Sequence, residues 1–288
     1  LAVLLSRHRC ALPGFRHRAR VDRYPQICLV MVVVNCRAGQ RSNRLVVFAH
    51  AMASAIARGE RLRVTTFDEF KGDYACKVPD GLKVVIKPSR FWEWVRLAER
   101  VVQIMFGFKA FQIPYLLTLV STWNYRDEKA LARCEDKIRK FFDPVKVGNA
   151  RSVLSGIRRG DKTLIGVHIR RQDYRAFLGG RYYYDDSVYR REMARLLEMM
   201  KGEIREAQFV VFSDETVDES HFEGLPCYFA HGSAVEDQWL MSQCDYLMGP
   251  PSTFSAWASF MGKVPLARMW SAGYGLKRED FAYRGLVA

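Results

Sequence analysis

Residues 27–43 read ICLVMVVVNCRAGQRSN and contain the first structural unit of the chain. Ile27–Cys36 is an apolar, Val-rich run, which is typical of a strand buried on both faces of a parallel sheet. A short loop with Gly39 follows, and then Leu45–Ala57, an apolar and Ala-rich stretch of helical length. Asn43 precedes this stretch and is a favourable N-cap residue. The segment therefore predicts a strand, a glycine loop and a helix.

The alternation of strands and helices continues along the chain. In the first half we expect strands at Leu62–Thr66 and Lys83–Ile86 and a mostly helical, aromatic-rich region over residues 91–142. In the second half, apolar runs predict strands at Thr163–Ile169, Gln208–Phe212, Pro226–Phe229, Asp245–Met248 and Val264–Ala267, and helices at Ser187–Met200, Val235–Gln243 and Phe254–Met261.

This pattern predicts an α/β protein with two parallel sheets covered by helices. The 288 residues are 49% hydrophobic and 26% charged, which argues against disorder and against a coiled coil as a description of the whole chain. We place an N-terminal domain at residues 31–150 and a C-terminal domain at 151–288. Two such domains facing each other form a ligand cleft at the carboxyl ends of their strands.

The chain is strongly basic. It has 45 Lys and Arg against 31 Asp and Glu, a net charge of +14. Such a charge favours a polyanionic partner: nucleic acid, an anionic membrane or a phosphorylated ligand. Residues 1–30 are a basic extension with six arginines among the first 25 residues; they are either a functional tail or, as we favour, precede a true start at Met31. Seven cysteines without a CxxC pair predict reduced thiols.

Val101–Val120 is the other candidate for membrane contact. It is 20 residues long with one charge, Lys109, but Gln103, Gln112 and Pro114 make it less apolar than a spanning helix. We expect a core helix here. Attachment to a membrane surface is the alternative, because arginines flank the segment.

The first segment with chemical character is residues 166–174, GVHIRRQDY. An apolar strand leads directly into His168, Arg170, Arg171 and Asp173. Neighbouring side chains on a strand point in opposite directions, so one arginine can reach a ligand while the other is held by an acid such as Asp173. The planar guanidinium suits a pyrophosphate because it makes paired, charge-assisted hydrogen bonds. A surface salt-bridge cluster is the alternative.

The second segment is residues 236–255, EDQWLMSQCDYLMGPPSTFS. Ser252 and Thr253 open a helix after a Gly-Pro-Pro turn, and hydroxyls with free backbone N–H groups at a helix start form an anion site. Simple N-capping explains the same residues. Asp237 stands at the start of its own helix, where it either suits the helix dipole or accepts hydrogen bonds from a ligand.

The third segment is the loop Gly39–Asn43, GQRSN. It lacks the GxGxxG spacing of a dinucleotide fingerprint, so that interpretation is weak, and a plain turn capped by Asn43 is the alternative. Residues 209–214, FVVFSD, add a strand that ends at Asp214, on the same sheet edge as His168.

Together the three segments resemble the fucosyltransferase superfamily, nearest to the α-1,2-fucosyltransferases of glycosyltransferase family 11. Those proteins carry a glycine-rich loop ending in Asn, an H-x-R-R-x-D-Y segment and a late Ser-Thr-Phe-Ser turn, here at residues 39–43, 168–174 and 252–255. The resemblance runs from about Met31 to Arg268. It implies a GT-B fold with two Rossmann-like domains, GDP-fucose as donor substrate without a further cofactor, inversion at the anomeric carbon, and no required metal.

The resemblance also implies roles for residues. Arg170 would hold the β-phosphate with support from Arg171, and Asn43 would lie near the fucosyl or acceptor side. We assign catalysis to Arg170, Asp173 and Asn43. We assign the nucleotide to His168, Arg170, Arg171, Asp214, Asp237, Ser252, Thr253, Phe254 and Ser255.

Two points stay open. For the general base, Asp173 is the nearest acid, with Asp185 and Asp186 as rivals, and Asp173 could instead orient Arg171. The loop also departs from the family, which usually has a glycine where this chain has Ser42, and Gln172 replaces another common glycine. These departures bear on the acceptor side of the cleft.

We therefore expect an inverting, metal-independent α-1,2-fucosyltransferase that acts on a glycan or lipid-linked oligosaccharide. We expect it in the cytoplasm, with peripheral attachment to an anionic inner-membrane surface as a further hypothesis. One alternative is a non-catalytic protein that binds a nucleotide sugar. A basic nucleic-acid-binding protein is less favoured, because no nucleic-acid motif is present, and we expect no nucleic-acid partner.

Overall fold

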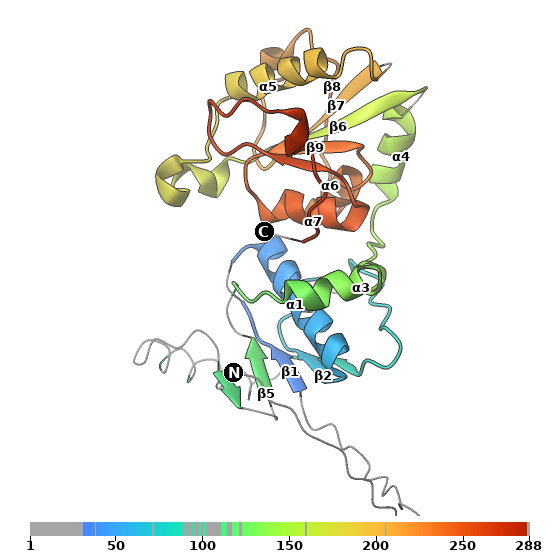
Figure 1. The fold of residues 1–288 in the computed structure, drawn as a ribbon, viewed down its shortest axis with the longest axis vertical. Coiled ribbons are helices and arrows are strands. Elements are labelled where there is room, and N and C mark those ends of the chain that lie inside the picture. Colours follow the sequence, from blue (N-terminus) through green and yellow to red (C-terminus); the bar gives the residue numbers. More distant parts are fainter. Residues whose placement is uncertain are drawn as a thin grey trace, which may run out of the picture.

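The computed structural model describes residues 31–286, with gaps at 38, 71, 89–90, most of 92–116, 121–122, 159 and 205. Two α/β lobes follow each other along the longest axis of the molecule (Figure 1). We call residues 31–146 the N-terminal lobe and residues 147–286 the C-terminal lobe.

The N-terminal sheet has the strand order β3-β2-β1-β5-β4. Its central strand β1 (Met31–Val34) pairs in parallel with β2 (Arg61–Val64) and β5 (Leu117–Val120), so that Val32 lies opposite Leu62 and Thr118. The strand β3 (Val84–Ile86) extends the parallel part, whereas β4 (Phe111–Ile113) pairs with β5 in antiparallel orientation. Helices α1 (Arg41–Arg58) and α3 (Glu128–Phe141) pack against each other (Figure 1).

The C-terminal sheet is fully parallel and has the order β10-β9-β6-β7-β8. Its strands are β6 (Lys162–Ile169), β7 (Glu206–Ser213), β8 (Cys227–Phe229), β9 (Tyr246–Gly249) and β10 (Leu266–Arg268). Its helices are α4 (Gly148–Ile157), α5 (Asp186–Met199), α6 (Ala234–Met241) and α7 (Thr253–Gly262). The strand order reverses between β6 and β9, which is where such sheets bind ligands.

Close strand packing at this reversal depends on glycine. A Cβ atom at Gly249, the last residue of β9, would lie 2.6 Å from the carbonyl oxygen of His168 on β6. A Cβ atom at Gly166 would lie 2.5 Å from the Leu247 side chain. The carboxyl ends of β6 and β9 therefore lie close together only because both positions lack a side chain.

Helix α7 joins the two lobes through aromatic packing. Its Trp257 is buried against Phe142 of the N-terminal lobe, with ring centroids 5.0 Å apart in an edge-to-face arrangement. Phe142 belongs to a cluster of edge-to-face rings with Phe48 and Phe67. The end of the chain also reaches this lobe, since the carbonyl of Leu286 lies 3.4 Å from Nε2 of His50.

Several predicted elements differ from the structure. The core helix expected over Val101–Val120 is wrong at its C-terminal end, where β4 and β5 form part of the N-terminal sheet. Pro114 disfavours a helix interior there, and β1 requires a strand on its open side. The sequence reading also missed α4. The first four residues of the expected strand Ile27–Cys36 lie outside the described residues.

Asn43 is not the N-cap of α1. The helix begins two residues earlier, at Arg41, with Gln40 in the N-cap position, so Asn43 lies in the first turn. Among the described residues, no helix is both long enough and apolar enough to span a membrane.

Candidate active site

A cleft of about 1030 Å³ lies between the lobes, at the carboxyl ends of the C-terminal strands. Nine of the predicted site residues line it: Asn43, His168, Arg170, Asp173, Asp214, Asp237, Ser252, Thr253 and Phe254. Its volume is at the upper end of the range of roughly 300–1,000 Å³ for small-molecule sites. The cleft thus has room for a large ligand or for two ligands side by side.

Two predicted site residues do not line the cleft. The guanidinium of Arg171 pairs with Asp186 below the cleft wall, and its backbone N–H donates to Asp214 at 2.8 Å. The buried Ser255 donates its hydroxyl to the carbonyl of Ser252 at 3.2 Å. The acid that holds Arg171 is therefore Asp186, and Asp173 instead pairs with Arg170.

Arg170 is held by carboxylates on both sides. Its Nη1 lies 2.7 Å from Asp214 and its Nη2 lies 2.7 Å from Asp173. The guanidinium carbon also lies 5.6 Å from the centroid of the Tyr174 ring, a cation–π distance. These contacts fix a positive charge at the end of β6, where the strand order reverses.

Gln40 reaches the same pair from the other lobe. Its Oε1 accepts a hydrogen bond from Nη2 of Arg170 at 2.6 Å, and its Nε2 donates to Asp173 at 2.9 Å. Sequence reasoning did not single out this residue. The only signal was its place directly after Gly39, in a loop already assigned to the cleft. The position of the Arg170 guanidinium therefore depends on both lobes.

A further hydrogen bond between the lobes involves buried side chains. Nε2 of the buried Gln238 on α6 donates to the hydroxyl of Ser42 at 2.9 Å. Ser42 is the residue that replaces the usual glycine of the loop. In this chain the departure from the family pattern therefore gives the N-terminal lobe an additional contact with α6.

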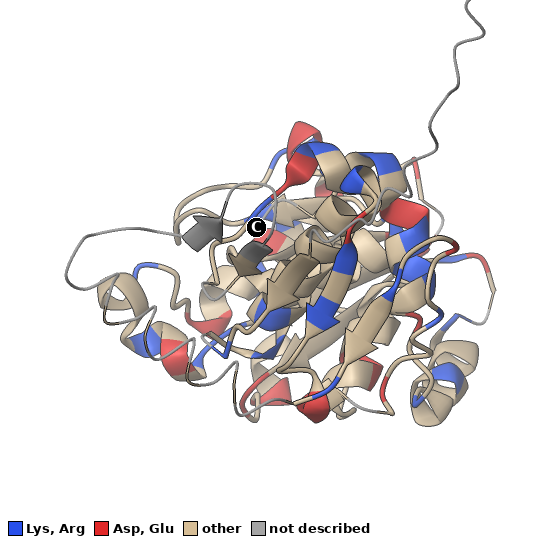
Figure 2. Ribbon diagram, turned by 90° about the horizontal axis from the view of Figure 1, so that it is seen from below, with Lys and Arg blue, Asp and Glu red and all other residues tan. Residues whose placement is uncertain are grey.

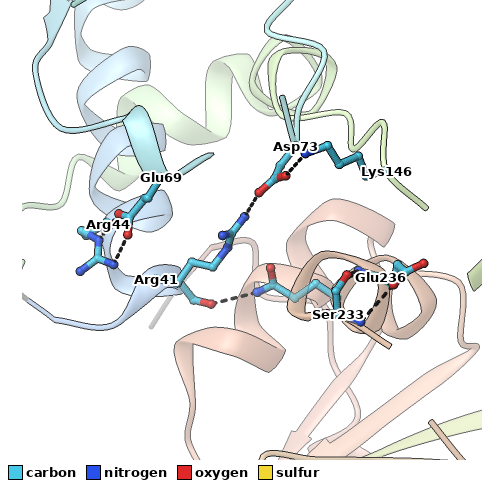
Figure 3. A network of polar contacts seen from close by, with 9 residues as sticks. Arg41, Arg44, Glu69, Asp73, Lys146, Ser233 and Glu236 are labelled. Atoms are coloured by element: carbon cyan, nitrogen blue, oxygen red, sulfur yellow. Dashed lines mark hydrogen bonds and ion pairs between the residues drawn. The ribbon is translucent and has the colours of Figure 1, made fainter. Parts of the chain in front are cut away.

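The glycine loop is fixed by ion pairs from the start of α1 (Figure 3). Arg41 pairs with Asp73, which Lys146 also approaches at 3.3 Å. Partial burial opposes the charge of Asp73, but the hydrogen bonds from Arg41 and Lys146 outweigh it and lower its pKa. Arg44 binds Glu69 with both ends of its guanidinium, at 2.5 and 2.6 Å.

His168 is a buried, neutral histidine. Burial, and then the charge of Arg170, lower its pKa to about 3. Its ring centroid lies 5.3 Å from that of Phe254, and its Nδ1 has no hydrogen-bond partner within the described structure. A buried polar atom without a partner is costly. An atom of this kind in a cleft wall is suited to a hydrogen bond with a ligand.

Asp237 is a half-buried carboxyl group in the cleft lining. Burial raises its pKa to about 7, although the backbone N–H of Gly232 donates to it at 3.1 Å. The other N-terminal acid of α6, Glu236, is used in a capping box with Ser233 (Figure 3). The Asp237 carboxyl is therefore left to face the cleft.

The N-terminus of α7 completes the floor of the cleft. Ser252 is its N-cap and accepts a hydrogen bond from the backbone N–H of Phe254 at 3.2 Å. Capping leaves further N–H groups of the first turn without an intrahelical partner, and these favour a negative charge. In the part of the chain that is described, no group of His, Cys, Asp and Glu side chains could hold a metal ion.

The comparison with protein families decides the identity of the chain. The model of glycosyl transferase family 11 matches residues 107–266, more than half of the sequence. The chain belongs to glycosyltransferase family 11. The family predicted from the three sequence motifs is therefore confirmed.

Two curated relatives carry related activities in their names. The family 11 chain is 26% identical to an alpha-1,2-colitosyltransferase of Escherichia coli over 158 residues, which are 49% of this chain and 51% of the relative. It is 28% identical to galactoside alpha-(1,2)-fucosyltransferase 1 of Rattus norvegicus over 130 residues, 39% of this chain and 33% of the relative. The chain spans about half or less of the length of these relatives.

Solved structures share the fold at low sequence identity. The NodZ alpha-1,6-fucosyltransferase soaked with GDP-fucose has a TM-score of 0.56 and 15% identity, covering 85% of this chain and 97% of that one. POFUT1 in complex with GDP-fucose has a TM-score of 0.54 and 13% identity, covering 84% and 98%. The predicted GT-B-like arrangement of two Rossmann-like lobes is confirmed.

Proposed function

We propose that this family 11 chain is an inverting fucosyltransferase that moves L-fucose from GDP-fucose to a glycan hydroxyl in α-1,2 linkage. The position of Arg170 carries the proposal. It lies at the end of β6, faces the interlobe cleft, and is held by Asp173 and Asp214. The names of the two curated relatives support this linkage, and the GDP-fucose bound in structures of the same fold supports this donor.

The reaction requires a stabilised leaving group. The acceptor oxygen attacks the anomeric carbon of fucose, the bond from that carbon to the β-phosphate oxygen breaks, and its electron pair leaves with GDP. Negative charge develops on the diphosphate, where Arg170 and the N-terminus of α7 at Ser252 and Thr253 would stabilise it. Residues 166–174 and 252–255 thus supply the positive end of the site.

Recognition of guanine is assigned to Asp237. Guanine presents two adjacent donors, N1–H and N2–H, and a carboxylate can accept both. Uracil presents one N–H donor on its corresponding edge. The unpartnered Nδ1 of His168 would take a hydrogen bond from the nucleoside. Both side chains line the same cleft.

Asp173 remains the proposed general base. Of the three acids considered from the sequence, it lines the cleft, whereas Asp186 is bound to Arg171 and Asp185 is exposed at the N-cap of α5. Both Asp173 oxygens accept hydrogen bonds, from Arg170 and Gln40, and each keeps a second lone pair for the acceptor proton.

The test is calorimetric titration with GDP, GDP-fucose, GDP-mannose and UDP, together with an assay of sugar transfer. We expect GDP and GDP-fucose to bind and UDP not to bind. Arg170→Ala should weaken GDP binding by about 10- to 100-fold, because hydrogen bonds to a charged group contribute roughly 1.5–3 kcal/mol. Transfer should fall below detection in this variant.

Arg175→Ala is the matched control. Arg175 lies five residues further on, is 60% exposed and pairs with Glu215 outside the cleft lining. It should bind GDP like the unchanged protein. Equal GDP binding by Arg170→Ala, or UDP binding as tight as that of GDP, would contradict the proposal.

The same titration distinguishes the proposed transferase from a second candidate function. Gln40 occupies two of the contacts of Arg170 and Asp173, which would suit a protein that binds a nucleotide sugar without transferring it. Tight GDP-fucose binding with no turnover on any acceptor sugar would favour that function. A nucleic-acid function has less support, since acidic and basic residues alternate along the described ribbon and neither kind gathers on one element (Figure 2).

A further inference from the structure

Exposed aromatic side chains surround the part of the cleft that the proposed donor site does not use. Trp123 is 52% exposed and follows β5 in the N-terminal lobe. Phe177 and Trp270 are 47% and 44% exposed and belong to the C-terminal lobe. All three line the same cavity. Burying each such side chain would contribute about 1.5–3 kcal/mol, so their joint exposure on both sides of one cleft indicates a ligand surface.

Phe177 is held in a fixed position beside Arg170. Its ring stacks on Tyr174 with centroids 5.4 Å apart and an angle of 28°. Tyr174 in turn lies under the Arg170 guanidinium, and its hydroxyl donates to the carbonyl of Pro251. The ring of Phe177 is therefore separated from the phosphate-binding arginine by a single aromatic residue.

The backbone after Phe177 is strained. Leu178 has a φ of 50° and a ψ of 40°, and Gly179 and Gly180 follow with φ of 67° and 77°. A non-glycine residue in this region costs on the order of 1–2 kcal/mol. Phe177 and Leu178 both line the cleft from this turn.

Trp270 follows a backbone segment that contacts the same part of the C-terminal lobe. Tyr184 donates its hydroxyl to the carbonyl of Met269, the residue before Trp270. Tyr182, two residues before Tyr184, lies 6.5 Å from Tyr174 by ring centroids and also lines the cleft. Phe177, Tyr174 and Tyr182 thus form one aromatic cluster, and Trp270 lines the same cleft. We call these four residues the aromatic wall of the C-terminal lobe.

We propose that this aromatic wall, with Trp123 opposite, is the acceptor subsite, and that it binds a pyranoside by stacking on its C–H face. The inference rests on the proposed transferase function and assigns its second substrate. A pyranose ring combines an apolar face with a polar edge. The wall supplies rings for the face, while Gln172, Asp173 and Arg268 in the same cleft supply polar groups for the hydroxyls. A lipid chain offers these polar groups no hydrogen bond in place of those from water.

The position of the wall also suits the reaction. Because Phe177 stacks on the residue beneath Arg170, a sugar on Phe177 would lie next to the diphosphate end of the donor. Its hydroxyl would then be close to Asp173, the proposed base. The wall thus connects acceptor binding to the atoms that react.

The experiment measures the two substrates separately. GDP-fucose is the donor, and methyl β-D-galactoside, methyl β-D-glucoside and methyl α-D-mannoside are the acceptor probes. Transfer, acceptor-independent hydrolysis of GDP-fucose, and binding of each probe to GDP-saturated protein are recorded. In Phe177→Ala and Trp270→Ala, the acceptor KM should rise at least tenfold. The donor KM and the hydrolysis rate should stay within twofold.

Two control variants make the result specific. Phe177→Tyr keeps the ring and should keep the acceptor KM. Trp94→Ala removes an aromatic side chain that is 72% exposed and is not among the described cleft-lining residues, so it should change nothing. An unchanged acceptor KM in Phe177→Ala and Trp270→Ala would overturn the inference. So would failure of every probe to bind the GDP-saturated protein. Failure of the unchanged protein to bind GDP would instead count against the proposed function.

Discussion

At the scale of single residues, the site is governed by charges that the fold holds in place before a ligand arrives. Arg170 pairs with two carboxylates, Asp173 and Asp214, and donates a further hydrogen bond to Gln40. If a diphosphate binds as proposed, the guanidinium loses little conformational entropy, because its position is already fixed. The surplus negative charge of the two acids makes the N-terminus of α7 a necessary part of the anion site.

The raised pKa of Asp237 predicts that donor binding depends on pH. Its carboxyl must be deprotonated to accept N1–H and N2–H of guanine, but burial raises its pKa to about 7. Below that pH a proton must first be removed, so the Kd should rise about tenfold for each pH unit. Above that pH the Kd should level off. Calorimetry with GDP-fucose from pH 5.5 to 8.5 measures this, because its diphosphate is a diester that does not titrate in this range.

Asp237→Asn provides the control for that profile. An amide keeps the size of the side chain and does not titrate, so binding should be weak and flat across the pH range. Glu236→Gln, in the neighbouring capping box, should keep the full profile. A profile that persists in Asp237→Asn would show that another group titrates.

At the scale of elements, the sequence was informative where the hydrophobic pattern and the chemistry coincided. Residues 162–169 form a buried strand that leads directly into Arg170, and this placed the arginine in the cleft correctly. The same logic missed β4 and β5, because the apolar residues 111–120 fit a buried helix as well as a strand. What decides between them is the open side of β1, a tertiary requirement that local sequence does not contain.

The hydrogen-bond and ion-pair partners of the site residues also could not be predicted from the sequence. The pairs Gln40–Arg170 and Ser42–Gln238 join positions 130 and 196 residues apart. Their formation depends on how the lobes dock, which the spacing of motifs does not determine. Likewise, the sequence offered Asp173 as a partner for Arg171, and only the folded chain assigns Asp186 to that arginine.

Gly39→Ala tests the loop that begins α1. Gly39 has a φ of +79°, and a Cβ atom there would lie 2.7 Å from Nδ2 of Asn43. The substitution must therefore move the Asn43 amide, which lines the cleft. We expect kcat to fall at least tenfold while GDP binding, which rests on the C-terminal lobe, stays within twofold. Transfer kinetics and calorimetry measure the two effects.

Gly81→Ala separates backbone strain from the position of Asn43. Gly81 has nearly the same φ, +80°, but a Cβ atom there would meet nothing within 4 Å. Both variants should lose roughly 1–2 kcal/mol of stability, because alanine disfavours this backbone region. Equal losses of kcat in the two variants would mean that the Gly39 loop has no special place in the reaction.

At the scale of the whole molecule, the proposed activity requires the two lobes to keep their relative position. The cleft is lined by residues of both, and the hydrogen bonds of Gln40 span it. The lobes are joined on the far side of α7, where Trp257 and Phe260 pack into the aromatic core of the N-terminal lobe. Changes at this interface should therefore alter catalysis from outside the cleft.

Arg139 on α3 is the polar centre of that interface. Its Nε donates to the carbonyl of Phe260 on α7 at 2.7 Å, its guanidinium carbon lies 4.6 Å from the Phe260 ring, and Nη2 reaches Tyr283. Arg139→Met should cost roughly 1.5–3 kcal/mol, because it leaves partners of a mostly buried charge without hydrogen bonds. Thermal unfolding should show a Tm lower by roughly 3–12 °C.

The same substitution should separate transfer from nucleotide binding. Arg139 lies outside the cleft lining, so GDP should still bind through the C-terminal lobe. The rate constant kcat should fall, because a shift of the lobes would break the hydrogen bond between Gln40 and Arg170. Asp136→Ala removes another partner of Arg139 that is 77% exposed, and a surface pair of this kind contributes about 0–1 kcal/mol. That control should keep both Tm and kcat. Parallel losses of GDP binding and transfer in Arg139→Met would show that the interface supports the C-terminal lobe itself and not the alignment of the two lobes.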